Sequence, residues 1–264
     1  NAQGLVENVQ ILSSNLVQNP SFSEEGVQEV SNGSFSQEGS EELANPDFTN
    51  GLTSWNGGIG NTVVNNQLIV NTGGLFYQPL SLTANKTYKA EINIESISQG
   101  GVKFYCQGNQ SQTITTSGVH TIYIVSGSSN SLVGINPQGT FEAVVNSISF
   151  REVGQDWILG TGWSIGEDKA IHTGSTGNII TNASLFLNKN YKVQFEILSI
   201  ADGVCNIYDT GTSTTYESYT SNGIKTAYIK KDSNGSLAIR SNSSNVSITN
   251  ISVKEVGQNW VLGG

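Results

Sequence analysis

Two stretches of the chain repeat each other at a fixed distance of 103 residues. The segment Ile148–Gly160 (ISFREVGQDWILG) recurs as Ile251–Gly263 (ISVKEVGQNWVLG), and the same offset aligns Leu82–Ile92 with Leu185–Phe195. Self-similarity of this kind indicates a tandem duplication. A period near 100 residues is too long for a solenoid repeat and is typical of whole domains that follow one another. We therefore expect two related domains, and a further copy that begins near Gly264.

Within each repeat, apolar and polar residues alternate with a period of two. Examples are Thr87–Glu95 and Lys189–Ile197, and this pattern predicts half-buried strands. Clusters of Gly, Asn and Ser separate such runs, only 12% of the residues are charged, and no amphipathic helical stretch competes. The sequence predicts an all-β fold with two tandem antiparallel β-sandwich (jelly-roll-like) domains, over residues 43–153 and 154–257, with residues 258–264 starting a truncated further repeat.

A shorter repeat, with a period of 13 residues, precedes the first domain. Its copies are Leu16–Gly26, Glu29–Gly39 and Glu42–Gly51, and each contains an Asn followed three residues later by a Phe. The third copy runs into Trp55, so we predict that it forms the first strand of domain one. The other two copies look like spare versions of that strand.

These spare copies predict an extended N-terminal arm over residues 1–42. An extended segment with regularly spaced apolar residues can add to an exposed sheet edge through backbone hydrogen bonds. We expect the arm to pack on a neighbouring domain or subunit, with four side chains in apolar pockets, those of Val17, Phe22, Val30 and Phe35. The alternative is a flexible acidic linker, which the composition alone would favour.

Charge and cysteine content narrow the class of protein. A net charge of -9 and a pI of 4.6 oppose binding to nucleic acid and to anionic membranes. No apolar run approaches the ~20 residues that span a bilayer, and the first residues do not form a signal peptide. The absence of an initiator Met suggests a mature or excised piece.

Cys106 and Cys205 are too few for a disulfide scaffold, so we predict that both are small buried apolar residues.

The residues that carry catalysis or bind metals are scarce. His120 and His172 lie in no metal-binding motif, and Glu152 and Glu255 stand beside basic residues at strand ends. Asp47 and Asp168 could contribute oxygens to a Ca²⁺ site, but no EF-hand loop is present. We therefore predict no catalytic residues, no metal site and no cofactor.

Aromatic residues are the remaining candidates for a ligand site. Sugar rings stack on exposed aromatic faces while polar neighbours form hydrogen bonds. Tyr105 and Tyr123, with Gln107 beside them, predict a glycan-binding platform on the first domain. The alternative is that both tyrosines form ordinary cross-strand packing pairs. Trp55, Trp157 and Trp163 are predicted to lie in the core or at the domain junction.

Two segments resemble known families. Asn45–Trp55 (NPDFTNGLTSW) resembles the opening strand of jelly-roll carbohydrate-binding modules, and Asp156–Ala170 (DWILGTGWSIGEDKA) resembles the repeated modules of tailed-bacteriophage structural proteins from tail fibres, head fibres and capsid decorations. The resemblance implies a non-enzymatic virion structural protein that assembles through its arm, at a virion surface or outside the cell. Its partners would be other virion proteins or copies of itself in a homo-oligomer, and also host-surface glycans. The alternative function is a carbohydrate-binding module or adhesin that recognises surface glycans, and fold alone does not choose between them.

Overall fold

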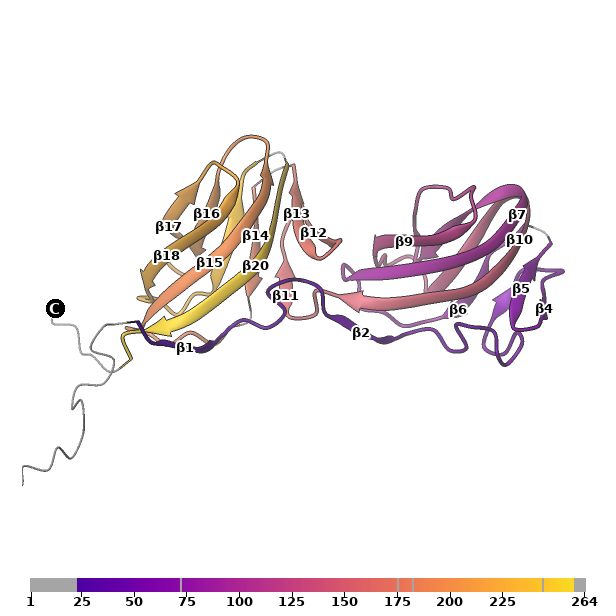
Figure 1. The fold of residues 1–264 in the computed structure, drawn as a ribbon, viewed down its shortest axis with the longest axis horizontal. Coiled ribbons are helices and arrows are strands. Elements are labelled where there is room, and N and C mark those ends of the chain that lie inside the picture. Colours follow the sequence, from indigo (N-terminus) through magenta and orange to yellow (C-terminus); the bar gives the residue numbers. More distant parts are fainter. Residues whose placement is uncertain (1–22, 72, 175, 182, 244, 259–264) are drawn as a thin grey trace, which may run out of the picture.

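The computed structural model describes residues 23–258, except residues 72, 175, 182 and 244. Across this part of the chain every regular element is a strand, and the strands form two antiparallel β-sandwiches (Figure 1). The predicted fold class is confirmed. No helix in the described part is long and apolar enough to cross a membrane. The predictions for Val17, Phe22 and residues 259–264 lie outside the described residues.

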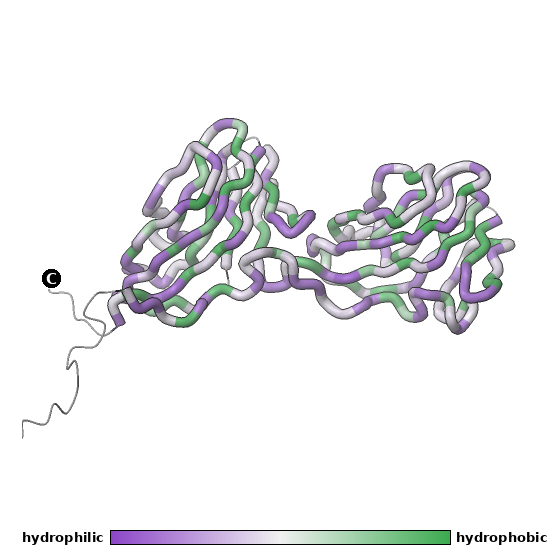
Figure 2. The backbone as a smooth tube through the Cα atoms, viewed as in Figure 1, coloured by the Kyte–Doolittle hydropathy of each residue, from purple (hydrophilic) through white to green (hydrophobic). Residues whose placement is uncertain are grey.

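Module 2, the C-terminal sandwich, has two separate sheets. The first sheet has the order β12 (Trp163–Gly166), β13 (Lys169–Thr173), β20 (Asn245–Val256), β15 (Asn190–Ile200) and β18 (Gly223–Lys230). The second sheet has the order β11 (Trp157–Leu159), β14 (Gly177–Thr181), β19 (Leu237–Ser241), β16 (Cys205–Asp209) and β17 (Thr214–Tyr219). Hydrophobic and hydrophilic residues alternate along the strands (Figure 2), as expected when one face of each sheet covers a core.

Module 1, the N-terminal sandwich, has strands equivalent to those of module 2, but some strands that are separate in module 2 are continuous in module 1. Its two long strands are β7 (Thr87–Cys106) and β10 (Leu132–Val153), and each corresponds to two strands of module 2. Irregular pairing between Gln138 and Ala143 marks the bend of β10. The remaining strands pair beside these two, and they are β2 (Glu38–Glu41), β3 (Asn56–Gly57), β4 (Thr62–Val64), β5 (Gln67–Val70), β6 (Phe76–Pro79), β8 (Asn109–Gln110) and β9 (Gly118–Val125).

Each module encloses its own apolar core. The cores share equivalent residues, such as Tyr88 and Tyr191, or Ile92 and Phe195, 103 positions apart. Cys106 and Cys205 are free thiols, both completely buried in these cores. The prediction that they act as small apolar residues is confirmed. The predicted burial of three tryptophans is confirmed too, with exposed fractions of 7% for Trp55, 3% for Trp157 and 6% for Trp163.

The described part of the N-terminal arm runs along both modules (Figure 1). Strand β1 (Glu25–Gln28) pairs antiparallel with β20 of module 2, and β2 pairs antiparallel with β10 of module 1. Val30 and Phe35 are buried in the core of module 2, with exposed fractions of 5% and 1%. The arm is therefore part of both sandwiches in the same chain, and residues 29–35 complete a module whose own first strand begins at Trp157.

The Asn-x-x-Phe motif is a turn in the second and third copies, which corrects the prediction that the third copy is a strand. Residues 45–48 lie outside every strand, and Asn45 and Phe48 both have a positive φ. The side chain of Asn45 holds the turn by accepting a hydrogen bond from Asn50 N–H (3.0 Å) and donating one to the carbonyl of Gly51 (2.8 Å). Asn tolerates this backbone region better than most residues. The strand precedes the motif, at β2.

Candidate functional site

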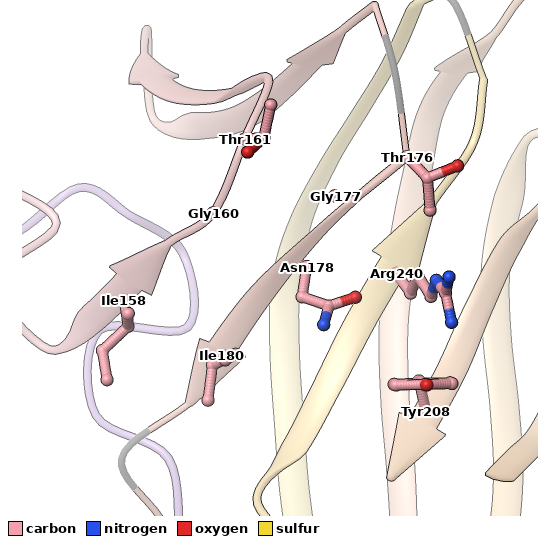
Figure 3. A pocket seen from close by; sticks show the side chains of 9 residues that line it. All are labelled: Ile158, Gly160, Thr161, Thr176, Gly177, Asn178, Ile180, Tyr208 and Arg240. Atoms are coloured by element: carbon pink, nitrogen blue, oxygen red, sulfur yellow. The ribbon is translucent and has the colours of Figure 1, made fainter. Parts of the chain in front are cut away.

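The outer face of the second sheet of module 2 carries a hollow of about 350 Å³ (Figure 3). Four strands position its walls, β11, β14, β19 and β16. Asn178 and Arg240 lie opposite each other on neighbouring strands, and both alternate with residues that point into the core. The lining combines apolar, hydroxyl, amide and guanidinium groups, from Ile158, Gly160, Thr161, Thr176, Gly177, Asn178, Ile180, Tyr208 and Arg240.

Arg240 lies over the ring of Tyr208. Its guanidinium carbon is 4.6 Å from the ring centroid, which is a cation–π arrangement. A stacked guanidinium keeps its plane, so its N–H groups present a fixed set of hydrogen-bond donors. No carboxylate forms an ion pair with Arg240 among the residues that the structure describes. The hollow therefore holds a positioned cation whose hydrogen-bonding capacity is available to a ligand.

The residues beside Arg240 give the hollow a polar side and an apolar side. Asn206 is paired with Arg240 across the strands, and its Oδ1 atom is buried without a hydrogen-bond partner among the described residues. On the opposite side, Ile158 is 61% exposed and stands opposite Ile180. Binding sites for small polar molecules combine apolar walls with a few converging polar groups in this way.

A buried ion pair fixes the end of β16 next to Tyr208. Lys231 Nζ lies 2.6 Å from Asp209 Oδ2, and the two side chains are 2% and 0% exposed. Burial alone would raise the pKa of the Asp209 carboxyl. Hydrogen bonds from Lys231, Ser233 and the backbone N–H groups of Thr212 and Gly211 outweigh it and hold that pKa far below its usual range. Asp209 is thus an ionised anchor for the loops around β16.

The predicted tyrosine platform is not assembled in module 1. Tyr105 stands opposite Gly134 and Gln110, whereas Tyr123 stands opposite Lys89 in the part of β7 that belongs to the other layer. Both tyrosines alternate with core residues, so they face away from the core on opposite sides of the sandwich.

The predicted platform residues have other partners. The Tyr105 hydroxyl contacts the amide of Asn130, and Tyr123 packs against the core residues of module 2 near Gly166. Gln107 is 4% exposed and donates a hydrogen bond from Nε2 to the carbonyl of Leu80 (3.0 Å). The structure thus brings none of the three together as a ligand surface, because period-two alternation gives the face of a sheet but not the layer.

The other polar residues singled out from the sequence have structural partners. His172 is fully buried, with Nδ1 3.0 Å from the carbonyl oxygen of Ser243. Glu152 and Glu255 form equivalent ion pairs, with Lys86 (3.4 Å) and Lys189 (2.8 Å).

Asp47 and Asp168, the two aspartates considered as oxygen donors to Ca²⁺, are not part of a cluster among the described residues. Asp47 accepts hydrogen bonds from the backbone and hydroxyl of Thr49, and the backbone carbonyl of Asp168 accepts one from Thr249. The residues that the structure describes include no group of three or more His, Cys, Asp or Glu able to hold a metal.

Sequence reasoning missed Arg240, although one signal pointed to its neighbourhood. Tyr105 and Tyr208 occupy the same place in the 103-residue repeat. The strand register then places Asn136 of module 1 where module 2 has Arg240, since Tyr105 pairs with Gly134 and Tyr208 with Ala238. This equivalence comes from the strand register, since the 103-residue offset of the sequence alone aligns Arg240 with Pro137.

Two further hollows lie between the modules. One of about 400 Å³ is lined by Asn85, Thr87, Val125, Leu159, Gly160, Thr161 and Trp163, and one of about 210 Å³ is lined by residues 84–87, 153, 154 and 157–159. Each is lined by one tryptophan, Trp163 or Trp157, that is almost fully buried, and neither is lined by an arginine. They are spaces at a module junction and offer fewer converging polar groups than the hollow beside Arg240.

Comparisons with known proteins give fold likeness alone. No family model matches the chain, and no curated protein matches it. Similar solved structures include an allantoicase (TM-score 0.31, 11% identity, covering 75% of this chain and 78% of that one) and allantoicase from Saccharomyces cerevisiae (0.30, 9%, 76% and 79%). A fucolectin from striped bass (Morone saxatilis) serum is also similar (0.26, 8%, 91% and 100%). At these TM-scores the likeness carries no argument about function, and the comparisons do not support the bacteriophage assignment.

Proposed function

We propose that the chain is a non-catalytic glycan-binding protein of the carbohydrate-binding-module or adhesin type, whose binding site is the hollow beside Arg240. The observation that carries the proposal is the guanidinium held over Tyr208 without a carboxylate partner among the described residues. Sugars need an apolar wall for their C–H faces and fixed polar groups for their hydroxyls, and this hollow supplies both.

The chemistry of the site favours a saccharide that bears a carboxylate. Arginine binds carboxylates in a two-pronged geometry with charge-assisted hydrogen bonds. Asn178 and Thr161 would then meet hydroxyl groups, and Ile158 would meet the C–H face of the ring. Because the chain as a whole is acidic, this recognition depends on the one positioned arginine and not on a general positive field.

The test is calorimetric binding of the full chain to uronic-acid-containing and neutral oligosaccharides. Arg240→Ala and Tyr208→Ala should each weaken binding of the acidic sugar by at least tenfold. Tyr228→Ala is the matched control, since Tyr228 is an exposed aromatic residue (70%) on the other sheet and its removal should leave binding unchanged. Equal affinity of wild type and Arg240→Ala for the acidic sugar would exclude this site.

A structural role at a virion or cell surface is the second candidate. The observation in its favour is that β1 and β2 bind two sandwiches with one continuous segment, which suits a protein that displays modules in a row. Deletion of residues 1–42 would remove Val30 and Phe35 from the core of module 2 and strand β2 from the sheet of module 1, so the appropriate variant lacks residues 1–22 alone. An oligomer seen by light scattering for the intact chain, and lost in this variant, would support the structural role. A monomer in both cases would count against it.

A further inference from the structure

The two docking segments, defined as Glu29–Phe35 and Glu42–Phe48, bind their modules through the same contacts. Glu29 N–H donates to the carbonyl of Val253, and Glu42 N–H donates to that of Phe150, both at 2.9 Å. These partners are 103 residues apart and the donors 13. Each described copy of the 13-residue repeat therefore binds one copy of the 103-residue repeat.

The aromatic contacts repeat in the same way. Trp157 Nε1 donates to the carbonyl of Asn32 (3.0 Å), and Trp55 Nε1 donates to that of Asn45 (3.1 Å). The ring centroids of Phe35 and Trp157 are 5.0 Å apart, and those of Phe48 and Trp55 are 5.7 Å apart. Each module thus has a binding site for one Asn-x-x-Phe turn, called its acceptor below. A tryptophan at the start of the module covers the bound turn.

The segments and the modules are paired in opposite order along the chain. The later segment, Glu42–Phe48, binds module 1, and the earlier one, Glu29–Phe35, binds module 2. Thirteen extended residues reach at most about 45 Å, so each step back along the arm moves one module further along the row. The next step back reaches Leu16–Phe22, whose sequence LVQNPSF has the same Val, Asn, Ser and Phe as EVSNGSF at Glu29–Phe35.

The acceptor of module 2 does not suit this first copy. A Cβ atom on Gly33 would lie 2.0 Å from the carbonyl oxygen of Ile251, too close for any other residue without a backbone shift. The first copy has Pro20 at that position, as the segment on module 1 has Pro46. Pro46 still accepts the hydrogen bond from Ile148 N–H (2.9 Å) that Gly33 accepts from Ile251 N–H. The first copy therefore matches an acceptor of the module 1 type.

We propose that Leu16–Phe22 is a docking segment for a third sandwich module of this same fold, one that lacks its own Asn-x-x-Phe turn and opens with a tryptophan equivalent to Trp55 or Trp157. This inference does not rest on glycan binding. The module could follow Trp260, which repeats Trp157, or belong to a second chain. Leu12 stands 13 residues before Glu25 and 26 residues before Glu38, so the partner would carry uncharged residues where module 1 has Lys89 and Arg151.

The test extends the full chain with a third acceptor. Residues 56–155 are joined after Trp260, so that this tryptophan takes the place of Trp55. Amide hydrogen exchange of residues 16–22 should be at least tenfold slower in the extended chain than in the 264-residue chain. Phe22→Ala should abolish that protection in the extended chain and change nothing in the shorter one. Light scattering then separates docking within one chain, which gives a monomer, from docking between chains, which gives a dimer.

A second variant guards against a third module that fails to fold. In it, residues 16–22 of the extended chain are replaced by the sequence of residues 42–48, which docks on module 1. Protection of the replaced segment but not of the natural one would overturn the assignment of Leu16–Phe22. Lack of protection in both, while the amides of the added module are themselves protected, would overturn the proposal that residues 16–22 reach a third acceptor.

Discussion

The side-chain oxygen of Gln28 accepts a hydrogen bond from the backbone N–H of Val253 (2.7 Å), across 225 residues of sequence. Glu41 and Phe150 make the corresponding contact in module 1 (2.8 Å). In both cases a side chain of the arm satisfies a backbone donor on the edge of the last strand. The stability of each module is therefore coupled to a segment outside the 103-residue repeat.

Removing the aromatic side chain of a docking segment should destabilise one module at a time. Phe35 is 1% exposed in the core of module 2, and Phe→Ala at such a site costs about 3–5 kcal/mol. Phe35→Ala should lower the calorimetric transition of module 2 and leave that of module 1 in place. Phe48→Ala should do the reverse, and a shift of both transitions by either variant would contradict separate cores.

Glycine at position 33 should be required for docking on module 2. Because a Cβ there would meet the Ile251 carbonyl oxygen at 2.0 Å, Gly33→Ala should cost about 1–3 kcal/mol through forced displacement. Urea unfolding of module 2 measures the change. Ser34→Ala is the control, since the Ser34 hydroxyl bonds only to the exposed Ser36 hydroxyl (2.8 Å), and it should unfold like the wild type.

Acid should loosen the arm before it unfolds the cores. Hydrogen bonds from Lys192 and Lys254 lower the pKa of Glu25, and one from Lys89 lowers the pKa of Glu38. A carboxyl whose pKa is lower in the folded state stabilises the fold above its ordinary pKa, about 4.3, and this contribution is lost as pH falls below that value.

The measurement is the Tm difference between pH 7 and pH 3 at low salt. It should be smaller for the Glu25→Gln/Glu38→Gln variant than for the wild type. An identical pH dependence of the two proteins would show that the ion pairs of the arm contribute nothing.

Breaking the buried ion pair of module 2 should be strongly destabilising. Lys231→Met leaves the Asp209 carboxylate buried and unpaired, which costs about 3–5 kcal/mol. The double variant Asp209→Leu/Lys231→Met removes both charges and should recover much of the loss. Denaturant midpoints give both values, and a Lys231→Met protein as stable as the wild type would place the pair in solvent.

The two thiols should be unreactive in the folded protein. Burial raises the pKa of Cys106 and of Cys205 to about 12, and the thiolate is the reactive form. A thiol reagent at pH 8 should label neither cysteine in native buffer and both in denaturant. Rapid labelling of one cysteine in native buffer would show that its module opens locally.

The repeats in the sequence predicted the number of modules and their main strands because they record the same contacts twice. They left open whether the arm packs on a neighbouring module or on another subunit. The burial of Val30 and Phe35 followed from their spacing. What could not be predicted was the layer to which each strand belongs. Tyr105 and Tyr123 have the same alternation, yet β7 bends between them and separates their faces. Arg240 was missed because its partner Tyr208 lies on a different strand, with no sequence motif to join them.

The reverse pairing of arm and modules also sets an order of events during synthesis. Domains fold as units while the chain is made, starting from the N-terminus. Glu42–Phe48 can meet its acceptor once Phe150 has been added, whereas Glu29–Phe35 must wait for Val253. The nascent chain therefore closes module 1 first and carries an apolar segment without its acceptor until the last strand of module 2 is complete.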